Sequence, residues 1–268
     1  MDFSHIIGYA ASILIGLSLG LLGSGGSILT VPVLVYLFLL DAVEATFYSL
    51  FIVGFTAAIG SVSYLKNNLV SLKLLVIFGL PSLVSVFFTR AFIVPAIPNH
   101  LFFTNNVSIT KNLLFLILFA LLMIVASVSM IKKNKPTICS ETKNTNHILL
   151  IIEGLLLGLI TGLVGAGGGF LIIPALVMLS KTSIKEAIGT SLVIVTLNSL
   201  IGFLSNGNLT GVNWTLVTSI ICFASIGVFI GMYLSKKIDA SKLKPLFGWF
   251  VLTMGVYIIV KEGSRIIN

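Results

Sequence analysis

Long apolar runs separated by short polar turns cover almost the whole chain. Eight runs approach or reach membrane-spanning length: residues 6–22, 45–65, 70–94, 113–131, 148–164, 187–204, 212–234 and 246–260. Two shorter apolar pieces, 28–40 and 170–179, each follow a glycine cluster. At about 1.5 Å of rise per residue, such pieces are shorter than the roughly 30 Å hydrocarbon core. The pattern predicts an all-α polytopic membrane protein of ten segments, two of them half-helices.

The chain also repeats itself with an offset of 142 residues. The run 20–32 returns as 162–174, so that Gly23, Gly25, Gly26 and Pro32 are matched by Gly165, Gly167, Gly168 and Pro174. An apolar protein duplicated around a broken helix is typical of transporters. We expect an N-terminal membrane repeat over 1–131, a linker over 132–147 and a C-terminal membrane repeat over 148–268.

Composition supports the membrane assignment. Hydrophobic residues make up 57% of the chain and charged residues only 9%, with a mean hydropathy of +1.15; soluble domains average about 25% charged residues. The first apolar run has Asp2 as its one preceding charge and no A-x-A-like cleavage site, so we interpret it as a mature helix. The two cysteines and three scattered histidines indicate no metal or cofactor site, and no clustered basic face indicates nucleic-acid binding.

The positive charges predict an orientation. If all ten segments cross, 12 lysines lie on the side of the linker and 4 basic residues on the other: Arg90, Lys111, Lys261 and Arg265. If both half-helices return to their own side, the counts become 8 and 8. The positive-inside rule favours the first arrangement. We therefore expect a bacterial inner-membrane protein with a cytoplasmic linker, both termini outside, and two inverted repeats.

The glycine clusters are candidates for anion binding. A helix N-terminus carries free N–H groups and about half a positive charge, and glycines before it let a ligand approach the backbone. A Cβ at Gly26 or Gly168 would then collide with the ligand or forbid a positive φ. The alternative is that these glycines only allow close helix packing.

Polar side chains near the glycine clusters are further candidates for binding an anion. Their hydroxyl or amide groups can donate to an anion, or they can bond their own helix backbone instead. Glu153, inside an apolar segment, is a candidate proton-coupling group, although it lies close enough to the boundary to reach the interface. Glu44 and Glu186 are interpreted as residues stabilising helix starts. The full set of candidate substrate-binding residues is Gly23, Ser24, Gly25, Gly26, Ser27, Ser49, Gly165, Ala166, Gly167, Gly168, Gly169, Thr190, Ser191 and Asn198.

The sequence resembles that of the TauE/SafE family of membrane permeases, also described as sulfite exporters. The resemblance is carried by Gly162–Pro174 followed by Ala187–Leu192, and by 211–214 with Gly227 and Gly231. It implies a carrier for small sulfur-containing anions such as sulfite or organosulfonates, driven by an ion gradient. The first repeat departs from the family pattern where Ser27 replaces the third glycine, where Phe47 and Tyr48 replace Gly-Thr, and at an inserted loop with two prolines, 95 and 98.

Three other functions compete with a secondary anion transporter that has protons as a candidate coupling ion. A passive anion channel could use the same scaffold. A membrane-embedded enzyme would need paired acids, a histidine cluster or a nucleophile with its base, and the spans contain none of these. A membrane scaffold would have no use for two matched glycine clusters.

Overall fold

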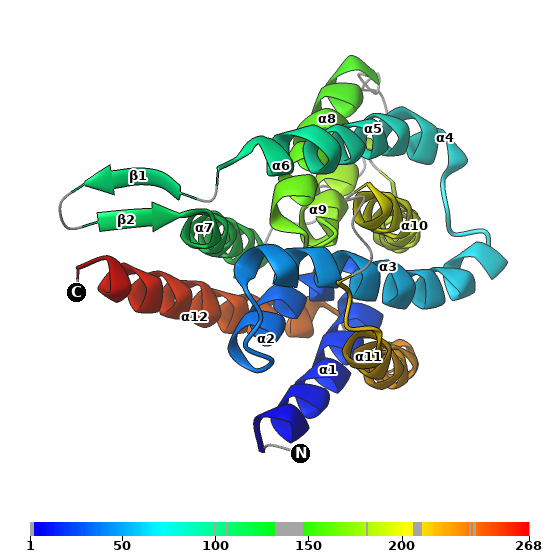
Figure 1. Ribbon diagram of the computed structural model, residues 1–268. Coiled ribbons are helices and arrows are strands. Elements are labelled where there is room, and N and C mark those ends of the chain that lie inside the picture. Colours follow the sequence, from blue (N-terminus) through cyan, green and yellow to red (C-terminus); the bar gives the residue numbers. More distant parts are fainter. Residues whose placement is uncertain are drawn as a thin grey trace.

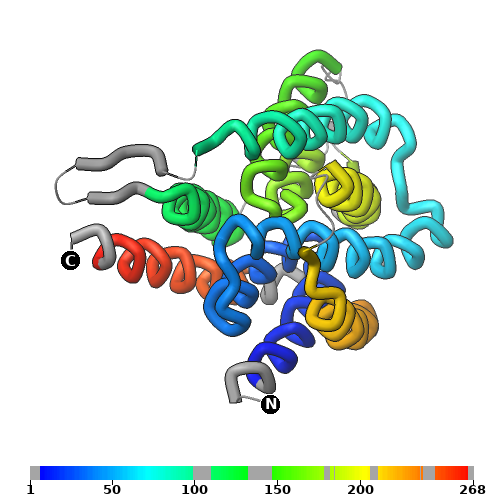
Figure 2. Tube along the Cα trace, in the orientation of Figure 1, coloured from blue at the N-terminus to red at the C-terminus, as the bar shows by residue number. Residues whose placement is uncertain are grey.

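A computed structural model describes residues 3–98, 100–104, 107–131, 147–180, 182–205, 211–235, 237 and 240–267. The described part is predominantly helical, and its helices pack around a buried centre formed by α3, α9 and α10 (Figure 1). The tube in Figure 2 follows the same path from the N-terminus to the C-terminus. The predicted linker, 132–147, lies outside the described residues except for its last residue.

The first repeat contains most of the irregular elements. Its helices are α1 (Phe3–Leu22), the 3-10 helix η1 (Gly23–Leu29), α2 (Thr30–Tyr36) and α3 (Ala42–Lys66). One long run then passes through α4 (Leu72–Leu74), the π-helix η2 (Leu75–Gly79), α5 (Leu80–Phe88), the π-helix η3 (Thr89–Ile93) and α6 (Val94–Ala96). A hairpin of β1 (His100–Thr104) and β2 (Val107–Thr110) leads into α7 (Lys111–Ile131).

The second repeat is more regular. It consists of α8 (His147–Val164), α9 (Gly169–Ser180), α10 (Ile184–Leu204), α11 (Trp214–Ser235) and α12 (Ala240–Ile267). Glu186 lies in the first turn of α10, as predicted, and its backbone N–H donates to the side chain of the N-cap residue Ser183 at 3.2 Å. Glu44 likewise lies in the first turn of α3.

The predicted segment boundaries hold within a few residues except for the last segment, 246–260, which belongs to the longer helix α12, and for the half-helix 28–40. Within the described residues, eight helical stretches are long and apolar enough to span a membrane. The first, Ile7–Tyr36, runs through the first glycine cluster, whereas α9 is a separate short helix of 12 residues. Only Thr30–Tyr36 of the predicted half-helix 28–40 is α-helical. The chain is therefore a multi-pass, all-α membrane protein with a short α-helix after the glycine cluster of each repeat.

Two corrections concern the loop before α7. The two prolines at 95 and 98 predict an irregular loop, but part of this stretch forms the β1–β2 hairpin, which projects beside α7 and α12 (Figure 1). Pro95 lies in the three-residue helix α6, which ends the long helical run that passes through η3. Asn105 and Asn106 lie outside the described residues. Arg90, counted above among the basic residues on the outer side, is fully buried in η3.

Helices from the two repeats pair reciprocally. Helix α1 packs against α11, and α8, which is equivalent to α1, packs against α5, which is equivalent to part of α11. The equivalent helices α3 and α10 pack on each other, as do α7 and α12 (Figure 1). An inverted repeat related by a pseudo-two-fold axis would produce this exchanged pairing, and the arrangement is compatible with one.

Small residues allow these close helix contacts. A Cβ added to Gly16 of α1 would lie 1.8 Å from the carbonyl oxygen of Ala224 in α11. At the equivalent contact, a Cβ on Gly158 of α8 would lie 2.3 Å from the carbonyl oxygen of Ser82 in α5. Both helix backbones therefore touch where the glycines stand, which is how small residues promote helix association in a bilayer.

Candidate functional site

The second glycine cluster forms an open turn between α8 and α9. Gly165, Gly167 and Gly168 have φ angles of +74°, +67° and +64°, a region that other residues rarely occupy. The N–H of Gly165 donates to Thr161 and so ends α8, while Leu171 and Ile172 donate to Gly168 and so begin α9. The turn residues are all buried. The sequence-predicted half-helix therefore starts from a true break in the backbone, at the centre of the protein.

The first glycine cluster is folded differently. Residues Gly23–Leu29 form a 3-10 helix, and Gly23 alone among its glycines has a positive φ, +71°. The hydroxyl of Ser27 donates to the carbonyl of Ser24 at 2.9 Å, inside the same segment. The prediction of a glycine turn is therefore wrong for the first repeat. The backbone here stays helical from α1 to α2 with a single left-handed residue at the junction.

Serine hydroxyls connect the two clusters directly. Ser24 donates to the carbonyl of Gly169 at 3.0 Å, and its oxygen lies 2.8 Å from that of Ser191. Ser49 donates to the carbonyl of Gly165 in the other repeat. Hydroxyls predicted as substrate ligands thus form hydrogen bonds between the repeats in this conformation.

Three buried polar atoms of α8 and α10, the helices that flank α9, have no hydrogen-bond partner within the described residues. They are Thr161 Oγ1, Asn198 Oδ1 and Ser199 Oγ, and all three side chains are at most 1% exposed. Two of them border the turn: a Cβ on Gly168 would lie 1.9 Å from Thr161 Oγ1, and one on Gly167 would lie 2.9 Å from Ser199 Oγ. Buried polar groups are nearly always hydrogen-bonded, so these atoms point to a missing polar partner.

The backbone of the same turn offers further donors. The N–H groups of Ala166, Gly167 and Gly168 donate to no backbone or side-chain acceptor within the described part of the chain. Successive amides around left-handed glycines form concave sites that attract anions. The second cluster therefore combines free backbone donors with free hydroxyls in a buried setting.

Other predicted residues lie away from this turn. Thr190 accepts a hydrogen bond from the N–H of Ser71 at 2.9 Å, which turns its hydroxyl toward the connection between α3 and α4. Glu153 is half-buried with one oxygen unpartnered, about 18 Å along α8 from Gly165 at 1.5 Å per residue. The structure does not bring Glu153 together with the glycine clusters.

Sequence reasoning missed Thr161 and Ser199. A signal was present, because the equivalent positions in the first repeat carry Leu19 and Ala57, which are apolar. Asn198, which was predicted, differs from these two because its equivalent, Thr56, is also polar. Some polar residues lie inside a span, next to the duplicated motif, and in one repeat only. Such residues indicate which repeat has been specialised for binding a ligand.

The space around Gly26 and Gly168 bears on the prediction that a Cβ at these positions would collide with a ligand. A Cβ on Gly26 would lie 2.3 Å from the backbone N of Leu19 and 2.4 Å from Ser18 Oγ, so this glycine packs against α1. Gly168 combines a positive φ with the close approach of Thr161. Gly25 differs from both, because a Cβ there would meet only Leu22 Cβ at 3.8 Å, an ordinary contact.

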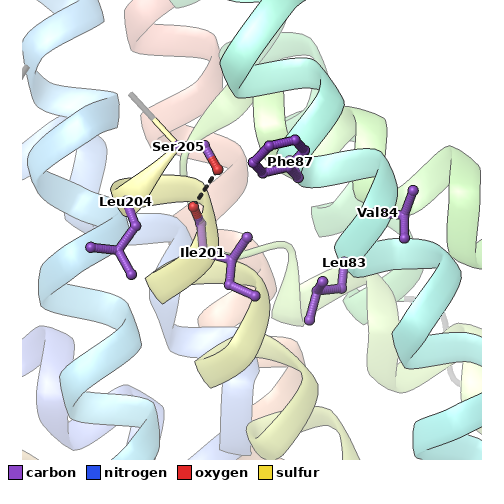
Figure 3. Close-up of a pocket in the computed structure, with 6 residues that line it drawn as sticks. All are labelled: Leu83, Val84, Phe87, Ile201, Leu204 and Ser205. Atoms are coloured by element: carbon purple, nitrogen blue, oxygen red, sulfur yellow. Dashed lines mark hydrogen bonds between the residues drawn. The ribbon is translucent and has the colours of Figure 1, made fainter. Parts of the chain in front are cut away.

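A surface hollow of about 400 Å³ lies elsewhere, between α5 and α10 (Figure 3). Its only side-chain polar group, the Ser205 hydroxyl, donates to the carbonyl of Ile201 at 2.6 Å. An apolar hollow of this kind does not suit an anion. It is lined by Leu83, Val84, Phe87, Ile201, Leu204 and Ser205.

No three His, Cys, Asp or Glu side chains gather where they could hold a metal ion in the described part of the protein. The fold and the buried, broken helices define a class: a multi-pass membrane protein built around two glycine clusters. The chain belongs to the sulfite exporter TauE/SafE family, whose sequence profile matches residues 8–258.

Several relatives carry names that indicate transport. A probable membrane transporter protein of Xylella fastidiosa (strain Temecula1) is 27% identical over 275 residues, covering 98% of each chain. One from Methanocaldococcus jannaschii is 35% identical over 115 residues, 41% of this chain and 43% of that protein. One from Bacillus subtilis is 24% identical over 250 residues, 91% of this chain and 96% of that protein. No solved structure gives a significant match.

Proposed function

We propose that the protein is a secondary transporter for a small anion that binds at the second glycine turn. The single observation that carries this proposal is the group of unpartnered buried polar atoms around that turn. Free amides at Ala166, Gly167 and Gly168 add donors from the backbone. The family name and the relatives' names support membrane transport over catalysis.

An anion would satisfy these groups without a fixed cation. The hydroxyls of Thr161 and Ser199 can donate to it, and hydrogen bonds to a charged partner contribute about 1.5–3 kcal/mol each. Asn198 donates through Nδ2 to Ser82 Oγ at 2.7 Å. Rotating this amide by 180° would let Ser82 donate to Oδ1 and leave Nδ2 free for the ligand. Three or four such bonds would hold an anion and still release it.

Sulfite or a small organosulfonate is the proposed substrate class, because the family is described by sulfite export. We propose alternating access between inverted repeats, in which the hydrogen bonds from Ser24 and Ser49 to the opposite repeat break and re-form. Protons are the proposed coupling ion, and Glu153 is the candidate group. The burial of the glycine turn in this conformation supports a carrier over an open channel.

The test is flux in proteoliposomes. Radiolabelled sulfite uptake would be measured with and without an imposed proton gradient, and again with unlabelled sulfite trapped inside. A carrier is expected to show accelerated exchange and gradient-driven accumulation. Uptake that only equilibrates, without exchange acceleration, would identify a passive channel. Repeating the assay with methanesulfonate and chloride would define the substrate class, and the Gly25→Ala variant is a folded control.

The orientation is a second proposal that can be tested directly. If all ten predicted segments cross, and with Arg90 buried in the protein, three basic residues remain on the outer side against 12 on the side of the linker. In a Cys222→Ser background, which removes the exposed thiol of α11, Cys139 is the only cysteine left. An impermeant thiol reagent should label Cys139 in inverted vesicles and not in intact cells. Labelling of intact cells would overturn the orientation.

A further inference from the structure

Arg90 is the largest fully buried side chain among the residues that the structure describes. It lies in η3 and within the candidate span Leu72–Ala96, and it is 0% exposed. An ionisable residue inside a span is rare unless it pairs with another group or serves a function. The burial of this guanidinium therefore requires an explanation.

No partner for the Arg90 guanidinium exists within the described residues. Its Nε, Nη1 and Nη2 atoms are all buried and all lack a hydrogen-bond acceptor. A second cation, Lys111 at the start of α7, lies close enough to feel the positive charge of Arg90. The Lys111 ammonium donates to the carbonyl of Val94 at 2.6 Å, one helical turn beyond Arg90. Two positive charges thus lie near each other, and no ion pair between either of them and an acidic side chain is found among the described residues.

The backbone around Arg90 is unusual as well. Residues Thr89–Ile93 form a π-helix, a conformation that is rare and often found at functional sites. The equivalent position in the second repeat is Met232, inside the regular helix α11. Among the described residues both π-helices, η2 and η3, lie in the first repeat, and η3 is the one that contains a charged side chain.

We propose that Arg90 and Lys111 form a second anion site, separate from the residues of the glycine turn, that takes an oxyanion with two or more oxygens. A guanidinium presents a planar fork of donors that matches such a ligand through two parallel hydrogen bonds. Burying an unpaired guanidinium is costly, so the enclosed conformation should be favoured when an oxyanion occupies the site.

The site lies next to the second glycine cluster. A Cβ on Gly162, three residues before Gly165, would lie 2.7 Å from Thr89 Cβ, and Thr89 directly precedes Arg90. The segment that carries Arg90 thus packs against the end of α8, close in sequence to the turn where the transported anion is proposed to bind. This site does not depend on that proposal, because Arg90 and Lys111 are not among the residues of the glycine turn and would bind any oxyanion with two or more oxygens.

The experiment measures thermal unfolding of the protein in phosphatidylcholine nanodiscs at constant ionic strength. Sulfite, sulfate, acetate and chloride are titrated against wild type, Arg90→Met and Lys111→Met. Arg90→Met introduces the residue that the second repeat carries at the same position. Lys261→Met is the matched control, since Lys261 is a cation that lies over the ring of Tyr36, 4.2 Å from its centroid.

The oxyanions are expected to raise the unfolding temperature of wild type more than chloride does. Arg90→Met should weaken the apparent affinity for oxyanions at least tenfold, and Lys111→Met should weaken it less. Without anion, Arg90→Met should be as stable as wild type or more stable, because an unpaired buried charge has been removed. Lys261→Met should leave the oxyanion response unchanged. Arg90→Lys keeps the charge without the fork and should recover only part of the affinity.

Two results would overturn the site. One is that Arg90→Met lowers stability without anion and leaves oxyanion protection intact, which would make Arg90 structural. The other is that phosphatidylglycerol in the nanodisc replaces the effect of soluble oxyanions, which would identify a lipid headgroup as the occupant. Protection by sulfate or acetate that depends on Arg90, in a protein that shows no sulfite flux, would support this site and contradict the proposed function.

Discussion

The two glycine clusters share a sequence pattern but have different structures. The second is an open turn with three left-handed glycines and unpartnered hydroxyls around it, whereas the first is a 3-10 helix with one left-handed glycine. In the first, Ser24 and Ser27 make hydrogen bonds where the second has Ala166 and Gly169. A duplicated motif therefore does not imply two equal binding sites, and the anion contacts should be concentrated in the second repeat.

The largest effect should come from comparing Gly167→Ala with Gly25→Ala, at equivalent positions. Gly167 has a φ of +67°, and a Cβ there would lie 2.7 Å from Val53 Cγ1, whereas Gly25 has room for one. The left-handed conformation alone costs alanine about 1–2 kcal/mol. We expect Gly167→Ala to lose both flux and thermal stability and Gly25→Ala to keep its fold. Equal losses in both variants would show that the clusters are equivalent.

The next effect is the loss of one donor in Ser199→Ala. Because the Ser199 hydroxyl has no partner among the described residues, its removal should not lower stability. Loss of a hydrogen bond to an anion is worth about 1.5–3 kcal/mol, so affinity for sulfite should fall roughly ten- to a hundredfold. Unfolding curves and half-saturating sulfite would be measured on the same preparation. Unchanged affinity would place the anion elsewhere.

A smaller effect is expected from Ser49→Ala and Ser191→Ala. Both hydroxyls bond the opposite repeat, so each change should lower stability by about 0.5–1.5 kcal/mol, the usual net value of a hydrogen bond. Relative to the loss of stability, the loss of affinity for sulfite should be smaller than in Ser199→Ala. A large affinity loss with unchanged stability would restore the serines as direct ligands.

Thr30→Ile should have the smallest effect. Its hydroxyl is buried and unpartnered, but it lies in the first repeat, and the equivalent residue of the second repeat is Ile172. We expect stability to stay the same or rise slightly and flux to remain near wild type. A loss of flux as large as that of Ser199→Ala would mean that the first cluster also contacts the anion.

Much of the fold could be predicted from the sequence because it depends on the length of apolar runs. Segments such as 113–131 and 148–164 agree closely with α7 and α8, since a helix in a bilayer must extend across the hydrocarbon core. The repeat offset likewise identified which elements correspond. Both features depend on composition along the chain alone.

The site was less predictable because it depends on partners distant in sequence. The glycine pattern of 23–26 did not distinguish a turn from a 3-10 helix, which is stabilised here by contacts of Gly26 with α1 and of Ser24 with Gly169. The hydroxyl of Ser199 becomes a candidate ligand of the anion only when the structure shows that it has no hydrogen-bond partner among the described residues. The burial of Arg90 depends on tertiary packing in the same way.

The exchanged pairing of α1 with α11 has a consequence for synthesis on the ribosome. Helix α1 is complete at Leu22, but α11 begins at Trp214, about 190 residues later. At about 5–20 residues per second, α1 must wait roughly 10–40 s in the membrane before its partner exists. Lipid chains can cover the glycine-lined face of α1 until then, because they are as apolar as the helix that later replaces them. Each half of the nascent chain therefore remains incomplete until the other has been inserted, and final assembly is a late, post-insertion step.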